Sequence, residues 1–168
     1  MKNIILKYGS ISGCIISAFM FTSAYLLYFH PNLFEPNMIV GFGVMFLGFT
    51  FVFIGIKNYR NKINEGLLSF GKAFKIGFFI AFLASCFYVV TWLIVYYTLM
   101  PDFIYKYADY TLAHTPSAEL ASQKIEMNTY IEWYKNPIWI ILLTFMEVLP
   151  FGIVIAFFSS LILMKKKT

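Results

Sequence analysis

Charged residues are scarce in this sequence of 168 residues, where Asp, Glu, Lys and Arg together make up 12 %. Soluble globular domains carry about 25 %, so this composition excludes an ordinary water-exposed surface. Hydrophobic residues account for 60 % of the chain, and 20 Phe and 12 Tyr are among the aromatic ones. The shortage of charge and the excess of apolar side chains predict an integral membrane protein.

Cysteine and histidine are also few. Cys14 and Cys86 stand inside apolar runs, which indicates neither a disulfide framework nor a thiolate zinc site. His30 and His114 have no Cys or paired acid at a metal-binding spacing, and no serine elbow or dinucleotide fingerprint is present. We therefore predict no metal, no cofactor and no enzymatic activity.

A nucleotide site is not expected either. The segment 66–73, GLLSFGKA, has the two glycines and the lysine of a Walker A loop. Ala73 stands where that loop needs a hydroxyl for magnesium, and an apolar run follows instead of a soluble helix. The net charge of +5 is concentrated on one side of the predicted membrane, so a nucleic-acid partner is not expected.

Four apolar runs are long enough to cross a bilayer, which takes about 20 residues. They cover residues 8–29, 38–56, 76–100 and 138–164, and Glu147 is the one formal charge within them. A lipid-embedded backbone must satisfy its own hydrogen bonds, and the runs lack the alternation of barrel strands. The sequence predicts an all-α four-transmembrane-helix bundle, with residues 1–168 as a single domain and 101–137 as a partly helical outer loop.

The basic residues predict the orientation of the bundle. One side carries ten of the 13 Lys and Arg residues: Lys2, Lys7, Lys57, Arg60, Lys62, Lys72, Lys75, Lys165, Lys166 and Lys167. The other side carries Lys106, Lys124 and Lys135. The positive-inside rule then places both termini in the cytoplasm. We expect Lys57, Arg60, Lys62, Lys72 and Lys75 to act as anchors at the inner interface, beside lipid phosphates.

Small residues recur on three of the four spans. They are Gly9, Gly13 and Ser17 on the first, Gly41, Gly48 and Gly55 on the second, and Gly77, Ala81 and Ser85 on the third. Such rows let helix backbones approach closely in lipid. They predict a compact bundle, and the same rows could instead form the seam of a homodimer.

The outer loop predicts one helix. Thr115 followed by Pro116 is typical of a helix start, and the helix is expected to continue to Lys135. Aromatic residues in and after the loop fit an interfacial belt: Tyr105, Tyr107, Tyr110, Tyr130, Trp133, Tyr134 and Trp139. The loop is either a helix lying on the outer leaflet or a surface that binds a membrane-protein partner.

Glu147 is the most unusual residue of the sequence. It lies nine residues into the fourth apolar run, about 13 Å deep at 1.5 Å per residue. A carboxylate there costs about 2.5–3.5 kcal/mol on insertion scales, and no span carries a cation to pair with it. We expect Glu147 to be substantially protonated at neutral pH. Its expected hydrogen-bond partners are hydroxyl groups: Thr144, Ser17, Thr22, Thr50, Ser85, Tyr88 and Thr91.

Pro150 follows Glu147 by three residues, removes one backbone donor and frees a carbonyl near residue 146. Glu147, Pro150 and Thr144 therefore form the candidate polar site within the membrane. Two interpretations are open. Glu147 is either a proton or cation carrier site, or a neutral group that stabilises the bundle by hydrogen bonds between helices.

The chain resembles a known family. The run 66–77 (GLLSFGKAFKIG), the Tyr-rich outer loop and the segment 147–152 (EVLPFG) are similar to the small four-span membrane proteins of the domain-of-unknown-function 4199 family. The resemblance implies a multi-pass protein of a bacterial inner membrane and implies no activity. The expected function is a non-enzymatic bundle that binds or organises another envelope component. The alternative is a small proton- or cation-coupled transporter that uses Glu147.

Overall fold

The computed structural model describes residues 1–30 and 38–165. In these ranges the helices and strands are limited to six α-helices and one isolated β-bridge, joined by turns. The helices are α1 (Lys2–Phe29), α2 (Met38–Lys62), α3 (Phe70–Thr98), α4 (Phe103–His114), α5 (Leu120–Tyr134) and α6 (Pro137–Leu163). Helices α1, α2, α3 and α6 are long and apolar enough to cross a membrane. The predicted all-α membrane architecture with four spans is confirmed.

Three of the four spans extend beyond the predicted apolar runs. Helix α1 begins at Lys2 rather than residue 8, α2 continues to Lys62 rather than 56, and α3 begins at Phe70 rather than 76. Hydropathy marks the part of a helix that lipid surrounds, whereas the backbone hydrogen bonds continue until a turn interrupts them. Here that turn contains Glu65 and Gly66, whose φ angles are +50° and +80°. Several lysines therefore lie on helix ends rather than in loops.

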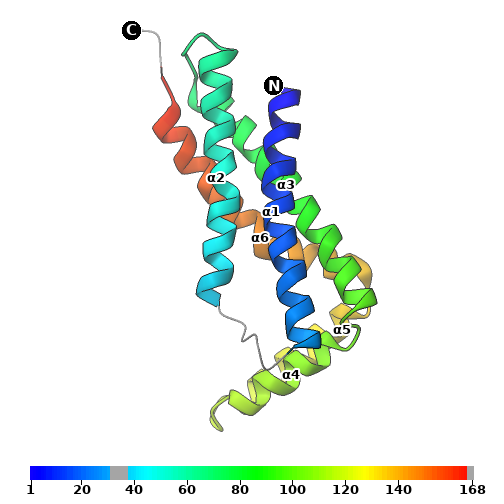
Figure 1. Cartoon of the computed structure of the whole chain (residues 1–168). Coiled ribbons are helices and arrows are strands. Elements are labelled where there is room, and N and C mark those ends of the chain that lie inside the picture. The colour runs from blue at the N-terminus through cyan, green and yellow to red at the C-terminus, as the bar shows by residue number, and fades with distance from the viewer. Residues whose placement is uncertain (31–37, 166–168) are drawn as a thin grey trace.

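The long helices form a bundle in which α1 and α6 each pack against both α2 and α3, and α2 also contacts α3. The first turn of α1 and the last turn of α6 lie at one end of this bundle (Figure 1). We call it the terminal end. Helices α4 and α5 pack together beyond the opposite end, where α5 also contacts α6 (Figure 1). We call it the α4–α5 end.

Small residues bring the helices together. A Cβ atom added at Gly9 or Gly13 would lie 2.8 Å from Leu83 or Phe87 of α3, respectively. On α2, Gly48 faces Ile16 of α1, and Gly55 faces both Ile80 and Tyr8. Ser17 on α1 and Ser85 on α3 are also buried, at 7 % and 0 % exposure. Gly41 differs from the prediction, because an added Cβ there would meet no described atom within 4 Å.

Hydrogen bonds connect the α2–α3 turn, α2 and α6 at the terminal end. The N–H of Leu68 donates to the carbonyl of Lys165, and the N–H of Lys165 donates back, which joins the α2–α3 turn to the end of α6. The Arg60 guanidinium donates to the Leu163 carbonyl at 3.3 Å. Arg60 therefore caps α6 in addition to any contact with lipid.

The other predicted anchors lie at the same end. Lys72 donates to the Asn64 side chain at 2.9 Å, and its ammonium lies 5.2 Å from the centre of the Tyr59 ring. Lys57, Lys62 and Lys75 are exposed. All five predicted anchors thus sit on the last turns of α2 or the first turns of α3.

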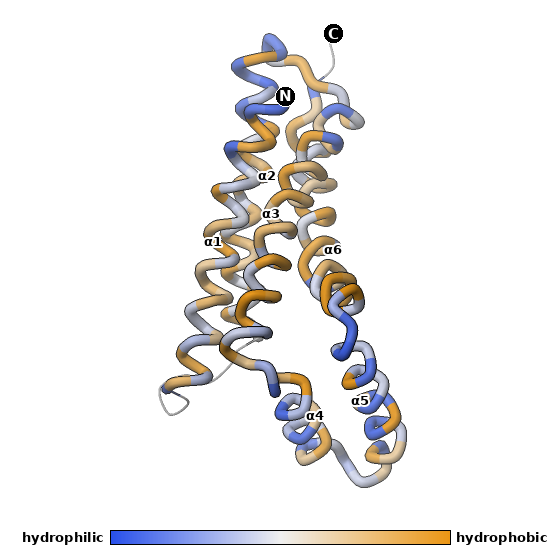
Figure 2. The backbone as a smooth tube through the Cα atoms, turned by 90° about the vertical axis from the view of Figure 1, so that its right-hand side faces the viewer, coloured by the Kyte–Doolittle hydropathy of each residue, from blue (hydrophilic) through white to orange (hydrophobic). Residues whose placement is uncertain are grey.

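The outer loop contains two helices where the sequence predicted one. The start predicted at Thr115 is wrong, because the Thr115 hydroxyl donates back to the carbonyl of Thr111 in α4. A turn closed by the Glu119 N–H and the Pro116 carbonyl then leads into α5. Thr115 thus ends one helix instead of capping the next. Helices α4 and α5 form a hairpin that continues past the bundle (Figure 2).

Candidate functional site

Small residues hold α3 and α6 together in the half of the bundle nearer the terminal end. A Cβ atom added at Gly77 would lie 3.0 Å from Cβ of Ala156, and one added at Gly152 would lie 2.8 Å from Cβ of Ala81. The two helices therefore nearly touch along this seam. Ala81 and Ala156 are fully buried there.

Larger side chains follow on both helices towards the α4–α5 end. Tyr88 and Trp92 succeed Ala81 and Ser85 on α3, while Leu143 and Thr144 precede Gly152 on α6. Helices α3 and α6 diverge in this direction (Figure 2). The change from small to bulky residues along one helix pair gives the physical reason, because bulky side chains hold helix axes further apart.

A cavity of about 280 Å³ lies where the two helices diverge. It is lined by Tyr88, Trp92, Phe103, Tyr134, Leu143, Thr144 and Glu147. These residues come from α3, the start of α4, the end of α5, and α6. The cavity has aromatic walls and one ionisable carboxyl group.

Glu147 lies on the wall of this cavity. It follows the first residue of α6 by ten positions, about 15 Å along the helix, and Tyr88 precedes the last residue of α3 by the same number. The Tyr88 hydroxyl donates to Oε1 of Glu147 at 3.4 Å. Glu147 is exposed rather than enclosed in a packed seam. The carboxyl group is thus both deep along the span and accessible from the cavity.

The aromatic side chains at the α4–α5 end form a connected cluster. Trp92 and Phe103 pack edge to face with ring centres 4.9 Å apart, and Tyr96 and Tyr134 do so at 5.4 Å. Phe103 also contacts Tyr134 at 6.2 Å. Burial raises the pKa of the Tyr134 phenol to about 12, a shift that a hydrogen bond with Trp92 opposes and the Glu147 carboxylate increases. Tyr134 therefore stays neutral over the physiological range.

Residues 7–165 match the family model described as "Protein of unknown function (DUF4199)". The chain belongs to this family. The match covers α1 from residue 7 onward, the other three long helices and the α4–α5 hairpin, so the whole cavity lies inside the family region. Comparison with curated proteins and with solved structures finds no significant match. Membership in the DUF4199 family accounts for the resemblance in sequence and assigns no activity.

The structure brings together two of the three predicted site residues of this DUF4199 chain. Thr144 lines the cavity beside Glu147, but its hydroxyl donates to the Ile140 carbonyl one turn back. Pro150 is exposed and does not line the cavity. It still lacks the N–H that would bond the Met146 carbonyl, so the α6 backbone is weakened one turn beyond Glu147.

The predicted hydroxyl partners of Glu147 differ in whether they contact its carboxyl group. Tyr88 is the one whose contact with Glu147 is seen among the described residues. The hydroxyl groups of Thr22, Thr50, Ser85 and Thr91 each donate to a carbonyl of their own helix four residues back. The buried Ser17 hydroxyl has no described hydrogen-bond partner.

Sequence reasoning missed the part that Trp92 and Phe103 play in the cavity. Tyr88, Trp92 and Tyr96 recur at intervals of four on α3 and so share one face of the helix. That spacing is a signal for an aromatic stripe. Nothing in it indicates that the stripe faces Glu147, more than 50 residues further along the chain.

Proposed function

We propose that this protein is a small membrane carrier in which Glu147 binds and releases a proton or a monovalent cation. The observation that carries the proposal is the placement of Glu147, which lines an accessible cavity near the middle of a span. Ionisable groups at that depth are costly and mark ion or substrate pathways. A group needed only to join two helices would not require a cavity beside it.

The chemistry of the cavity favours a single positive charge. Glu147 supplies one carboxylate, and among the described residues no group of three or more His, Cys, Asp or Glu could hold a metal ion. Tyr88, Trp92 and Phe103 add aromatic surfaces, which attract cations when a ring face is presented to the charge. A proton, or a cation with a partly apolar surface, fits this combination better than a strongly hydrated divalent ion.

The proposal includes an orientation and a location. Basic residues cluster at the terminal end, which the positive-inside rule assigns to the cytoplasm. Lys166 and Lys167, which contribute to the count of basic residues at this end, lie outside the described residues. In this orientation the cavity lies on the outer side of the Gly77–Ala156 seam, in a bacterial inner membrane. The whole chain acts as one four-span domain, and no enzymatic step is part of the proposal.

A hydrophobic carbodiimide tests the proposal, because it modifies protonated carboxyl groups in apolar surroundings. Native membranes are labelled across a series of pH values, and the adduct on the Glu147 peptide is measured by mass spectrometry. We expect labelling of Glu147 to fall as the pH rises. Glu147→Gln controls for the site, and exposed Glu132, which pairs with Lys135, controls for surface carboxyl groups.

Absent labelling, or labelling that stays constant from acid to alkaline pH, would contradict the carrier role. A second measurement follows proton uptake into vesicles that contain the purified protein and an imposed cation gradient. Wild-type protein should carry protons and Glu147→Gln should not. Equal uptake by the two proteins would also contradict the proposal.

A second candidate function rests on a different surface. On α4, Tyr107 and Tyr110 are three positions apart and share one face, and they are 47 % and 65 % exposed. Tyrosines are enriched at protein interfaces, so this face fits the role of binding another envelope component, which the sequence first indicated. Tyr110→Glu should then lose a partner that wild-type protein retains during purification from native membranes, without changing the labelling of Glu147.

A further inference from the structure

A second cavity lies between α1 and α2 at the terminal end of the bundle. Its volume is about 290 Å³, and it is lined by Ile4, Lys7, Tyr8, Asn58, Lys62 and Ile63. The cavity is formed by the first two turns of α1, the last turns of α2 and Ile63, which directly follows α2. It is remote in sequence from the residues around Glu147, and the proposed carrier function makes no use of it.

Two lysines without carboxylate partners line this cavity. The ion pairs in the described part of the chain join Lys106 to Asp102 and Lys135 to Glu132, all in the α4–α5 region. Lys7 and Lys62 therefore have no described carboxylate within ion-pair distance. No acidic residue lines the cavity. Two uncompensated positive charges in one concave site attract an anion.

Tyr8 and Asn58 add directed hydrogen-bond donors. Gly55 lets the Tyr8 ring lie close against α2, because an added Cβ at Gly55 would come within 3.2 Å of that ring. One turn further along α2, the Asn58 side-chain amide donates to the Tyr8 hydroxyl. The phenol oxygen accepts this bond and keeps its own proton for a further acceptor. The cavity thus offers two ammonium groups and a phenol O–H to an oxyanion.

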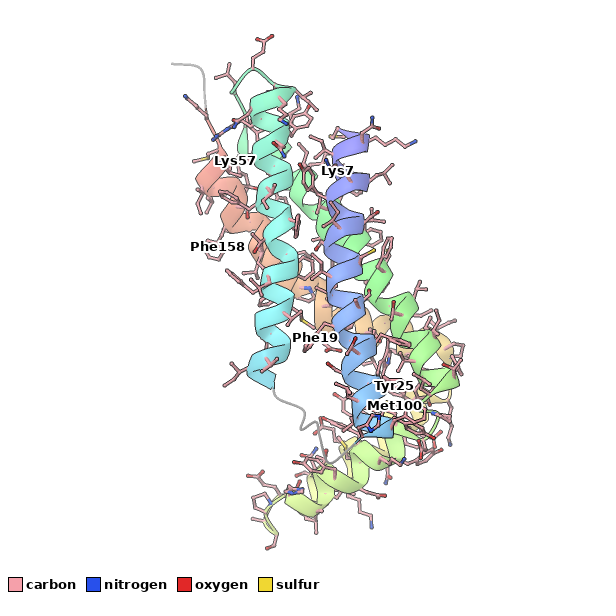
Figure 3. All side chains as sticks on the ribbon, in the orientation of Figure 1. Lys7, Phe19, Tyr25, Lys57, Met100 and Phe158 are labelled. Atoms are coloured by element: carbon pink, nitrogen blue, oxygen red, sulfur yellow. The ribbon has the colours of Figure 1, made fainter. Side chains whose placement is uncertain are left out.

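The position and the apolar residues of the cavity indicate a lipid. Ile4 and Ile63 line it next to the charged groups, as glycerol and the upper acyl chain require. The cavity lies at a helix end, where many of the basic residues gather, and Figure 3 places Lys7 and Lys57 at this end on neighbouring helices. Basic pockets between membrane helices at this level bind the headgroups of anionic lipids.

We propose that this cavity binds the phosphodiester of an anionic phospholipid in the adjoining leaflet. Lys7 and Lys62 hold the phosphate oxygens from α1 and α2, and the Tyr8 hydroxyl donates a hydrogen bond to one of them. A zwitterionic lipid binds less well, because its quaternary amine meets no carboxylate in the cavity. The Tyr8 ring is also a poor site for the quaternary ammonium group, because the Lys7 ammonium already lies 5.6 Å from the ring centre.

Native mass spectrometry of the full chain in detergent tests this site. Phosphatidylglycerol and phosphatidylcholine with the same acyl chains are titrated separately, and the bound fraction is measured. We expect tighter binding of phosphatidylglycerol, and a loss of about 30-fold in its affinity when Lys7→Gln and Lys62→Gln are combined. Lys57→Gln is the matched control, because Lys57 is also an exposed lysine of α2 but does not line the cavity.

Three results would overturn the proposal. They are equal binding of the two lipids, an equal loss of affinity in Lys57→Gln, and displacement of the lipid by millimolar inorganic phosphate but not by chloride. The last result would assign the cavity to a soluble anion. If the double variant melts at a lower temperature than wild type in lipid-free detergent, Tyr8→Phe is measured instead. It keeps both lysines and should weaken phosphatidylglycerol binding, because the phosphate loses the hydrogen bond from the phenol; unchanged binding would overturn the proposal.

Discussion

The seam between α3 and α6 makes a sharp prediction about stability. In Gly152→Ala, the new Cβ would lie 2.8 Å from Cβ of Ala81 and 2.8 Å from Cε1 of Phe49. Carbon atoms in contact normally lie about 3.5–4.0 Å apart. Each overlap is therefore about 1 Å. Ala81 cannot rotate away, since its Cβ is fixed to the backbone, and Phe49 is fully buried. The helices must separate or the ring must shift.

Over-packing of this kind costs about 1–3 kcal/mol. A Gly-to-Ala change inside a helix also stabilises the helix by up to about 1 kcal/mol through its higher helix propensity. A control variant must therefore measure this gain separately. Gly43→Ala does this, because Gly43 is a helical glycine of α2 whose added Cβ would meet no described atom within 4 Å. The difference between the two variants isolates the overlap.

The assay is unfolding of the purified chain in mixed micelles, followed by circular dichroism as the denaturing detergent is increased. We expect Gly152→Ala to be about 1–3 kcal/mol less stable than Gly43→Ala. We also expect its Glu147 carbodiimide labelling to change, because the seam sets the separation of the helices around the cavity. Equal stability of the two variants would refute the close approach of α3 and α6 at Gly152.

Two further predictions concern the cavity. Tyr88→Phe removes the hydroxyl that donates to Glu147 and keeps the ring, so carbodiimide labelling of Glu147 as a function of pH should differ from that of wild type. An unchanged pH profile would show that the contact does not affect the carboxyl group. For Tyr134, burial raises the pKa of the phenol from 10.0 to about 12. The folded protein therefore keeps the full stability that the neutral, buried phenol contributes below pH 10, and loses it as the pH rises to about 12. The ultraviolet titration of wild type minus Tyr134→Phe should show one phenol ionising near pH 12, and a midpoint near 10 would contradict the burial of Tyr134.

The spans could be predicted well because hydropathy is a local property. Each apolar run is long enough to cross a bilayer whatever it packs against, so the four long helices follow from the length and hydropathy of each run. Their ends were predicted less well, since a helix continues past the apolar run until a turn such as that at Glu65 and Gly66. The outer loop was predicted least well, because Thr115 can cap a following helix or close a preceding one, and local sequence does not decide between them.

The candidate site could be predicted in part. Glu147 was identified from its charge, and Tyr88 was among its predicted partners, because both features depend on residue type and depth along a span. The aromatic walls were not predicted as a site. Trp92, Phe103 and Tyr134 come from three different helices, and no local pattern indicates that they meet.

The sequence by itself determined that the chain is a four-span helical membrane protein, basic at one end, with one carboxyl group deep in its last span. These properties follow from the transfer free energy of each residue and from the hydrogen bonds of each helix. Tertiary structure alone decided that this carboxyl group lines a cavity. The cavity exists because small residues on α3 and α6 meet at Gly77 and Gly152, while bulky ones meet further along, and that pairing depends on which helix faces turn towards each other.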